Sequence, residues 1–189
     1  MADIKGTYRL GPDCGRVLIK TGRAGLAARA GHDLTIEVTR WSGQVTIPDD
    51  EAGVTAATVS AELDFGSLAV REGTGGAKPL TDKDRRDIAN TAAKILGGGD
   101  QATATFTSAR VIPAGAGGAI EGTLTFRGKS QPVRLQVTSA APGRHYRGTA
   151  TVRQTDFGIT PYTGFFGALK LRDEVAVEFE ADLSRAARE

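Results

Sequence analysis

The chain has 189 residues, of which 40% are hydrophobic and 24% are charged, a composition typical of one globular domain rather than of a disordered chain. Its formal net charge is only +2 and it contains no pronounced basic run, which argues against a nucleic-acid-binding protein. The single cysteine, Cys14, excludes an internal disulfide and a zinc site built from cysteines.

Apolar residues spaced two apart dominate the first part of the chain and predict β-strands. Short strands are expected at residues 8–10 and 17–19, and a longer one begins at residue 34. Its apolar positions alternate up to Val38, but after Arg40 they shift by one residue, so that Trp41 starts the new apolar series. Such a shift predicts a bulge or a sharp bend within one long strand that continues to residue 47.

One segment has the period of a helix instead. Ile88, Ala92 and Ile95 recur on one face of a helix predicted over residues 81–96. Thr81 is the expected N-cap, and Asp84 three residues later completes a variant of the capping box. Because its apolar face is rich in alanine, we expect this helix to cover one end or side of a sheet rather than to form a core alone.

The remaining segments again have a period of two, and a hairpin turn is predicted at residues 127–130. The further strands are expected at residues 59–65, 102–106, 120–126, 133–137, 148–152 and 175–183. The predicted architecture is one all-β domain over residues 1–189, with about eight strands and one inserted α-helix, arranged as a sandwich or barrel. The interior of an eight-stranded antiparallel barrel is either filled by side chains or able to hold one small ligand.

The sequence contains no recognisable catalytic or metal-binding motif. Of its two histidines, His145 is expected to be exposed in a turn. His32 precedes Asp33 on a strand, where neighbouring side chains point to opposite faces and form no relay by themselves. We therefore predict no catalytic residue, no metal ligand and no cofactor. His32 is kept as a polar contact for a ligand or, in an alternative interpretation, as the general base of an enzyme acting on an apolar substrate.

Three segments together resemble the YceI-like lipid-binding family, whose members carry polyisoprenoids. Residues 122–137, GTLTFRGKSQPVRLQV, resemble a hairpin of that family; residues 156–159, DFGI, resemble the motif that follows it; residues 173–175, DEV, resemble the start of its closing strand. The resemblance covers about residues 7–183. It implies a lipocalin-like, extended eight-stranded antiparallel β-barrel that binds a polyisoprenoid, an isoprenoid quinone or a fatty-acid-like lipid for carriage, storage or sequestration.

The candidate lining of such a barrel is the apolar phase of each strand, together with four aromatic residues from the glycine-rich segment 157–166. The predicted ligand-binding residues are Leu34, Ile36, Leu63, Phe65, Phe106, Leu124, Phe126, Val137, Val152, Phe157, Tyr162, Phe165, Phe166, Val177 and Phe179. The same residues would be plain core if the interior were filled, and both possibilities stay open. The aromatic residues of the segment either plug one barrel end or form a lid or portal.

The N-terminus lacks an apolar signal core, and no stretch of the sequence is apolar enough to span a bilayer. The protein is therefore expected to be cytoplasmic, although many members of the resembling family are exported. An apolar lipid is the expected partner, and homodimerisation through exposed strands or the helix is compatible with the sequence. A structural or stress-linked protein without a ligand is the third interpretation.

Overall fold

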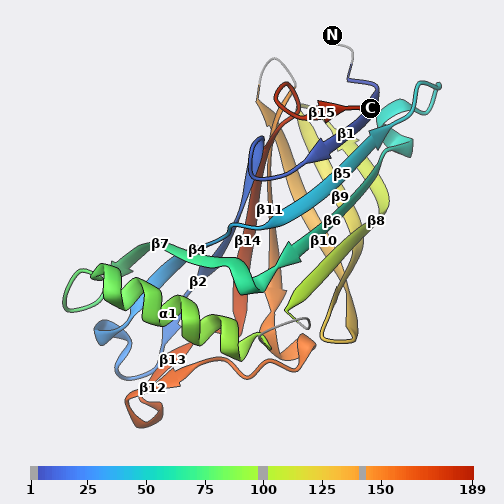
Figure 1. Ribbon diagram of the computed structural model, residues 1–189. Coiled ribbons are helices and arrows are strands. Elements are labelled where there is room, and N and C mark those ends of the chain that lie inside the picture. Colours follow the sequence, from blue (N-terminus) through green and yellow to red (C-terminus); the bar gives the residue numbers. More distant parts are fainter. Residues whose placement is uncertain (1–3, 98–101, 141–143) are drawn as a thin grey trace.

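Most strands of the protein belong to one strongly curled antiparallel sheet (Figure 1). This computed structural model describes residues 4–97, 102–140 and 144–189. The strands of the large sheet are β1 (Gly6–Leu10), β2 (Gly15–Thr21), β4 (His32–Val38), β5 (Trp41–Ile47), β6 (Thr58–Asp64), β7 (Leu68–Gly75), β8 (Thr103–Ala114), β9 (Gly117–Phe126), β10 (Lys129–Ala140), β11 (His145–Arg153), β14 (Glu174–Asp182) and β15 (Ala187–Arg188). Within the described ranges, these twelve strands are hydrogen-bonded in the order β15-β1-β5-β6-β8-β9-β10-β11-β14-β2-β4-β7. A small sheet has the order β12 (Thr163–Gly164), β13 (Leu169–Leu171) and β3 (Arg23–Ala24).

The predicted eight-stranded barrel needs a correction. Several strands are consecutive segments of one pass, meaning one traverse of the chain along the sheet. β1 and β2 form one pass and β4 and β5 form the next, so that β1 pairs with β5 (Tyr8 opposite Val45) and β2 pairs with β4 (Val17 opposite Val38). β6 with β7, and β14 with β15, share neighbouring passes in the same way. The described strands thus trace eight passes, and bends divide four of these passes into two strands each, which gives twelve strands. The sheet is a half-barrel because β6 pairs with β8 whereas β7 pairs with β4.

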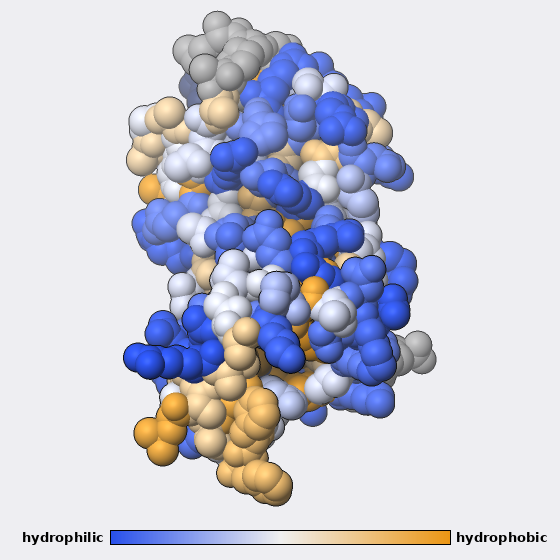
Figure 2. Space-filling view, turned by 90° about the vertical axis from the view of Figure 1, so that its left-hand side faces the viewer, coloured by the Kyte–Doolittle hydropathy of each residue, from blue (hydrophilic) through white to orange (hydrophobic). Residues whose placement is uncertain are grey.

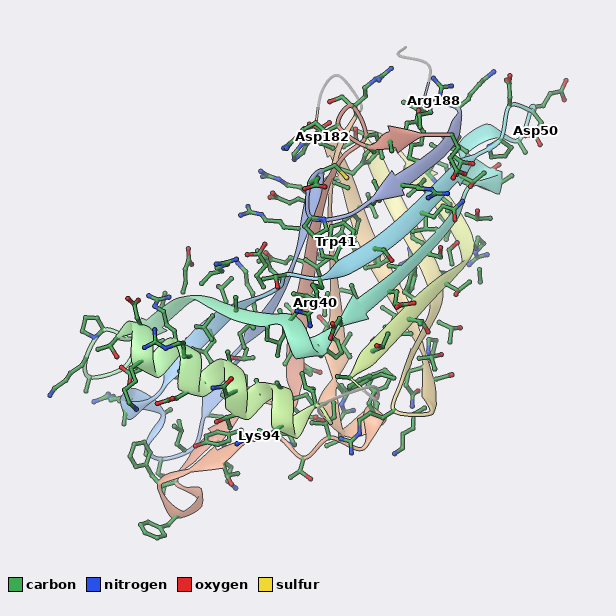
Figure 3. The ribbon with its side chains drawn as sticks, viewed as in Figure 1. Arg40, Trp41, Asp50, Lys94, Asp182 and Arg188 are labelled. Carbon is green, nitrogen blue, oxygen red and sulfur yellow. The ribbon has the colours of Figure 1, made fainter. Side chains whose placement is uncertain are left out.

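The predicted bend after Val38 is confirmed and lies beside a second bend. Thr39 and Arg40 separate β4 from β5, and the 3₁₀ turn η3 (Phe65–Ser67) separates β6 from β7. Buried Ser67 ties the two bends together, since its hydroxyl accepts from the Arg40 backbone N–H at 2.8 Å and donates to the carbonyl of Asp64 at 2.6 Å. The Arg40 side chain also pairs with the Asp64 carboxylate. Figure 3 shows Arg40 and Trp41 at this bend.

The predicted helix is present as α1 (Asp82–Ile95), with both hydrogen bonds of the capping box. The Thr81 hydroxyl accepts from the Asp84 backbone N–H, and the Asp84 carboxylate accepts from the Thr81 N–H at 2.9 Å. The helix lies across the lower end of the curled sheet in Figure 1, as expected for an element that covers a sheet rather than forming its own core.

The apolar face of α1 joins two hydrophobic clusters of the sheet. Ile88 and Ala89 pack against the cluster on β4 and β7, and Ile95 packs against the cluster that includes Phe126 of β9. The helix therefore spans the gap between β7, which pairs with β4, and β8, which pairs with β6.

The outer face of the sheet carries paired charged side chains on β2, β11 and β14. Glu180 pairs with Arg16 of β2 and with Arg147 of β11, and Glu178 pairs with Lys20 of β2. The hydrogen bond from Arg16 holds the pKa of Glu180 below its usual range. The opposite phase of β14 faces inward.

Candidate functional site

An elongated cavity of about 700 Å³ lies inside the curl. Its walls come from β2, β4, β5, β6, β8, β9, β10, β11 and β14, and α1 closes part of one side. Apolar side chains make up most of this lining. A volume of this size lies within the range of about 300–1,000 Å³ that is common for small-molecule sites. Of the two possibilities left open by the sequence, a filled core and a cavity, the structure has the cavity.

Most of the predicted ligand-binding residues line this cavity. They are Leu34, Ile36, Leu63, Phe65, Phe106, Leu124, Phe126, Val137, Val152, Phe157, Tyr162, Val177 and Phe179. Their shared inward direction follows from the period of two, which places alternate side chains of every strand on the concave face. Contact of these side chains with a ligand stays a prediction.

Two predicted residues do not line the cavity, which corrects the expectation for the aromatic segment. Phe165 and Phe166 are 62% and 113% exposed, whereas Phe157 is only 3% exposed. The reason is local: β12 and β13 form a hairpin whose turn, η6 (Phe165–Gly167), carries the two rings away from the sheet. Of the four aromatic residues, Phe157 is buried, Tyr162 lines the cavity but is 42% exposed, and Phe165 and Phe166 lie outside the lining. A role of this segment as a plug, lid or portal stays a prediction.

Aromatic rings shape the wall at the helix end of the cavity. Phe65 and Phe126 meet edge to face with their ring centroids 4.9 Å apart, and Phe157 lies 6.4 Å from Phe126. On the opposite wall, Phe179 lies over Gly148, its cross-strand neighbour, where an added Cβ would come within 1.9 Å of the ring. Glycine at this position therefore lets the ring lie flat on the sheet instead of filling the interior.

Few polar groups reach the cavity. The Thr21 hydroxyl, at the end of β2, is buried and has no hydrogen-bond partner within the described residues. His32 also lines the cavity, and its Nε2 lies 2.8 Å from the carbonyl oxygen of Lys78. Asp33, the neighbour of His32, is engaged elsewhere, because its carboxylate accepts from the Arg23 backbone N–H at 2.8 Å. His32 and Asp33 therefore do not form a catalytic relay, and no group of acidic, histidine or cysteine side chains suited to a metal is found among the described residues.

Other lining residues were not predicted. Ile19, Val45, Val59, Val133, Leu135 and Val175 belong to the same alternating phases and could have been found by extending each phase along its strand. Ile88 and Ile95 lie on the apolar face of the helix, which the sequence assigned to covering the sheet but not to the cavity wall. Leu169 and Leu171 of β13 carried no clear signal, because that strand is only three residues long.

The match to known families decides what kind of protein has this cavity. The model of the YceI-like domain matches residues 18–183. The chain belongs to the YceI-like family. This family binds apolar ligands, isoprenoids among them, in a barrel, and its members are generally binding proteins rather than enzymes.

Solved structures support the YceI-like fold. The chain is similar to BcnA of Burkholderia cenocepacia, with 22% sequence identity, a TM-score of 0.60 and coverage of 88% of this chain and 94% of that chain. It is also similar to the YCEI protein of Campylobacter jejuni, with 15% identity, a TM-score of 0.53 and coverage of 82% and 84%. At these identities the similarities concern the fold alone. Among curated proteins the sequence finds no match. In the part of this YceI-like chain that the structure describes, no helix is long and apolar enough to cross a membrane.

Proposed function

We propose that the protein binds one long apolar chain, an isoprenoid or acyl lipid, inside the curled sheet and carries, stores or sequesters it. The observation that supports this most directly is the cavity of about 700 Å³ inside the curled sheet, which is lined mainly by apolar side chains. The strands are long enough for an extended ligand: β8 and β10 have 12 residues each, which corresponds to about 40 Å at about 3.3 Å per residue.

The binding energy for such a ligand needs little polar contact. Burying about 300 Å² of apolar ligand surface contributes about 7 kcal/mol at about 25 cal/mol per Å², from which the entropy of association is subtracted. The cavity in turn supplies apolar walls and only a few polar groups, Thr21 and His32 among them. This arrangement favours selection by length and shape of the chain over recognition of a polar head group.

The proposal is tested by native mass spectrometry of the protein purified without detergent, followed by organic extraction and lipid analysis. The expected result is a bound species at one copy per chain that is identified as a prenyl or acyl lipid. A protein that emerges without lipid, and that also fails to take up added polyprenol or fatty acid, would contradict the proposed function.

A further inference from the structure

A small apolar surface protrudes at the end of the molecule that carries the small sheet. We call it the apolar tip, and it consists of Leu26, Phe165 and Phe166, which are 101%, 62% and 113% exposed. They are the three most exposed large hydrophobic residues in the described part of the chain. Figure 2 shows hydrophobic residues gathered at the lower end of this face, below a largely hydrophilic surface.

Backbone hydrogen bonds hold the two segments of the apolar tip together. The Ala27 N–H donates to the Ala168 carbonyl at 3.0 Å, and Ala24 of β3 lies opposite Lys170 of β13. The turn that carries the phenylalanines is closed by a bond from the Ala168 N–H to the Phe165 carbonyl at 3.1 Å. Leu26 therefore lies beside the phenylalanine turn on a paired scaffold.

The backbone of the turn that carries the two phenylalanines is strained. Phe165 and Phe166 have φ angles of 49° and 55°, in the left-handed region that favours glycine and disfavours bulky side chains. Their rings gain little burial in return, because they lie in solvent. Strain without compensating packing indicates a role for these side chains outside the protein's own core.

The tip is surrounded by positive charge. Residues 22–31 and 160–172 together contain Arg23, Arg29, Lys170 and Arg172 but no aspartate or glutamate. Arg23 pairs with Asp33, whereas the other three side chains are exposed and form no ion pair within the described residues. The outer face of the sheet differs, since its basic side chains are matched by acidic ones such as Glu180.

The same two segments also reach the cavity. Ala30 and Gly31 on one segment, and Tyr162, Leu169 and Leu171 on the other, line it from the inside. The small sheet thus presents the apolar tip outward and one end of the cavity inward.

We propose that the apolar tip docks this protein onto a lipid bilayer that carries anionic headgroups. Exposed phenylalanine and leucine side chains next to unpaired lysine and arginine are the combination that binds the interface of an anionic membrane, through apolar insertion and electrostatic attraction. A second copy of the chain fits the tip less well, because it would bring two clusters of unpaired positive charge together. Docking goes beyond the proposed function, since a cavity can bind a lipid without a membrane contact.

The test is flotation of the full chain with vesicles of phosphatidylcholine alone and with vesicles that also contain phosphatidylglycerol. The wild-type protein should float with the anionic vesicles and lose binding as salt is raised. Phe165→Asn together with Phe166→Asn should lower binding at least ten-fold, because asparagine tolerates the left-handed backbone but does not insert into the interface. Arg29→Gln with Lys170→Gln should lower binding to the anionic vesicles at least five-fold.

A matched control is Ala114→Asn, which changes an exposed apolar residue at the end of β8, outside the small sheet and outside the cavity lining. Its vesicle binding should stay at the wild-type level. The proposal is overturned if the wild type does not float, if the asparagine variant floats equally well, or if sedimentation shows that the tip instead joins two chains in a dimer. Binding of a soluble fatty acid by the asparagine variant shows that its cavity is intact and separates loss of docking from loss of the proposed function.

Discussion

The Thr21 hydroxyl combines burial with the lack of a hydrogen-bond partner in the described part of the chain. An unsatisfied buried hydroxyl lowers the free energy of unfolding by about 1–3 kcal/mol. Its presence in an apolar cavity therefore indicates a role in binding a polar group of the ligand. Thr21 ends β2 opposite Leu34, and His32 lies on the same neighbouring strand. A polar group at the end of a mainly apolar ligand would find its partners in this region of the cavity.

The role of this hydroxyl can be tested with Thr21→Val, which keeps the shape of the side chain and removes the hydroxyl. The ligand-free variant should be as stable as the wild type or more stable by about 1 kcal/mol, because no hydrogen bond is lost. Binding of a polyprenol should weaken up to about ten-fold relative to the corresponding hydrocarbon. Thermal unfolding and competition binding measure both effects. Thr123→Val, at an exposed position of β9 outside the cavity lining, is the control. Equal weakening for polyprenol and hydrocarbon in Thr21→Val would exclude the hydroxyl as an anchor.

Among the elements, α1 has a role that its composition alone does not indicate. Ile88 packs against the cluster on β4 and β7, and Ile95 packs against the cluster that includes Phe126. The helix therefore stabilises the cavity wall in the gap between β7 and β8, which do not pair with each other. None of the residues of this helix is fully buried, so packing stabilises it only weakly, and the capping box at Thr81 stabilises its first turn. Loss of the cap is therefore expected to loosen one wall of the cavity as well as the helix.

Thr81→Ala should lower the free energy of unfolding by about 1 kcal/mol, the usual cost of removing an N-cap. Thr91→Ala, in the middle of the same helix, should be neutral or stabilising by up to about 0.5 kcal/mol, since alanine is the better helix former. Chemical denaturation of both variants gives the comparison. Equal effects of the two substitutions would show that the capping box does not contribute to stability.

At the scale of the whole molecule, the alternation of apolar residues was sufficient to predict an all-β chain of about eight strands, the bend after Val38 and most of the side chains that line the cavity. It did not predict twelve strands, because the break at residues 65–67 depends on hydrogen bonds of Ser67 to a neighbouring pass, which are long-range contacts. The outward direction of Phe165 and Phe166 was missed for a different, local reason. It follows from two positive φ angles in a short hairpin turn, and periodicity carries no information about them.

If the cavity is a ligand site, it must differ in behaviour from a loosely packed core. The two possibilities respond differently to added volume. Extra atoms in a filled core force its side chains apart and cost about 1–3 kcal/mol, whereas extra atoms in a ligand cavity displace the ligand and leave the fold intact.

Ala150→Phe tests this most directly, because Ala150 is buried, lines the cavity and lies opposite Val177 on β14. The control is Ala176→Phe, one position from Val177 and outside the cavity lining. The deciding measurement is lipid occupancy per chain by native mass spectrometry, with denaturation of the same samples. The account predicts that Ala150→Phe loses most of its bound lipid without loss of stability, while Ala176→Phe keeps it. Full lipid occupancy in Ala150→Phe, or its unfolding as an overpacked core, would contradict the account.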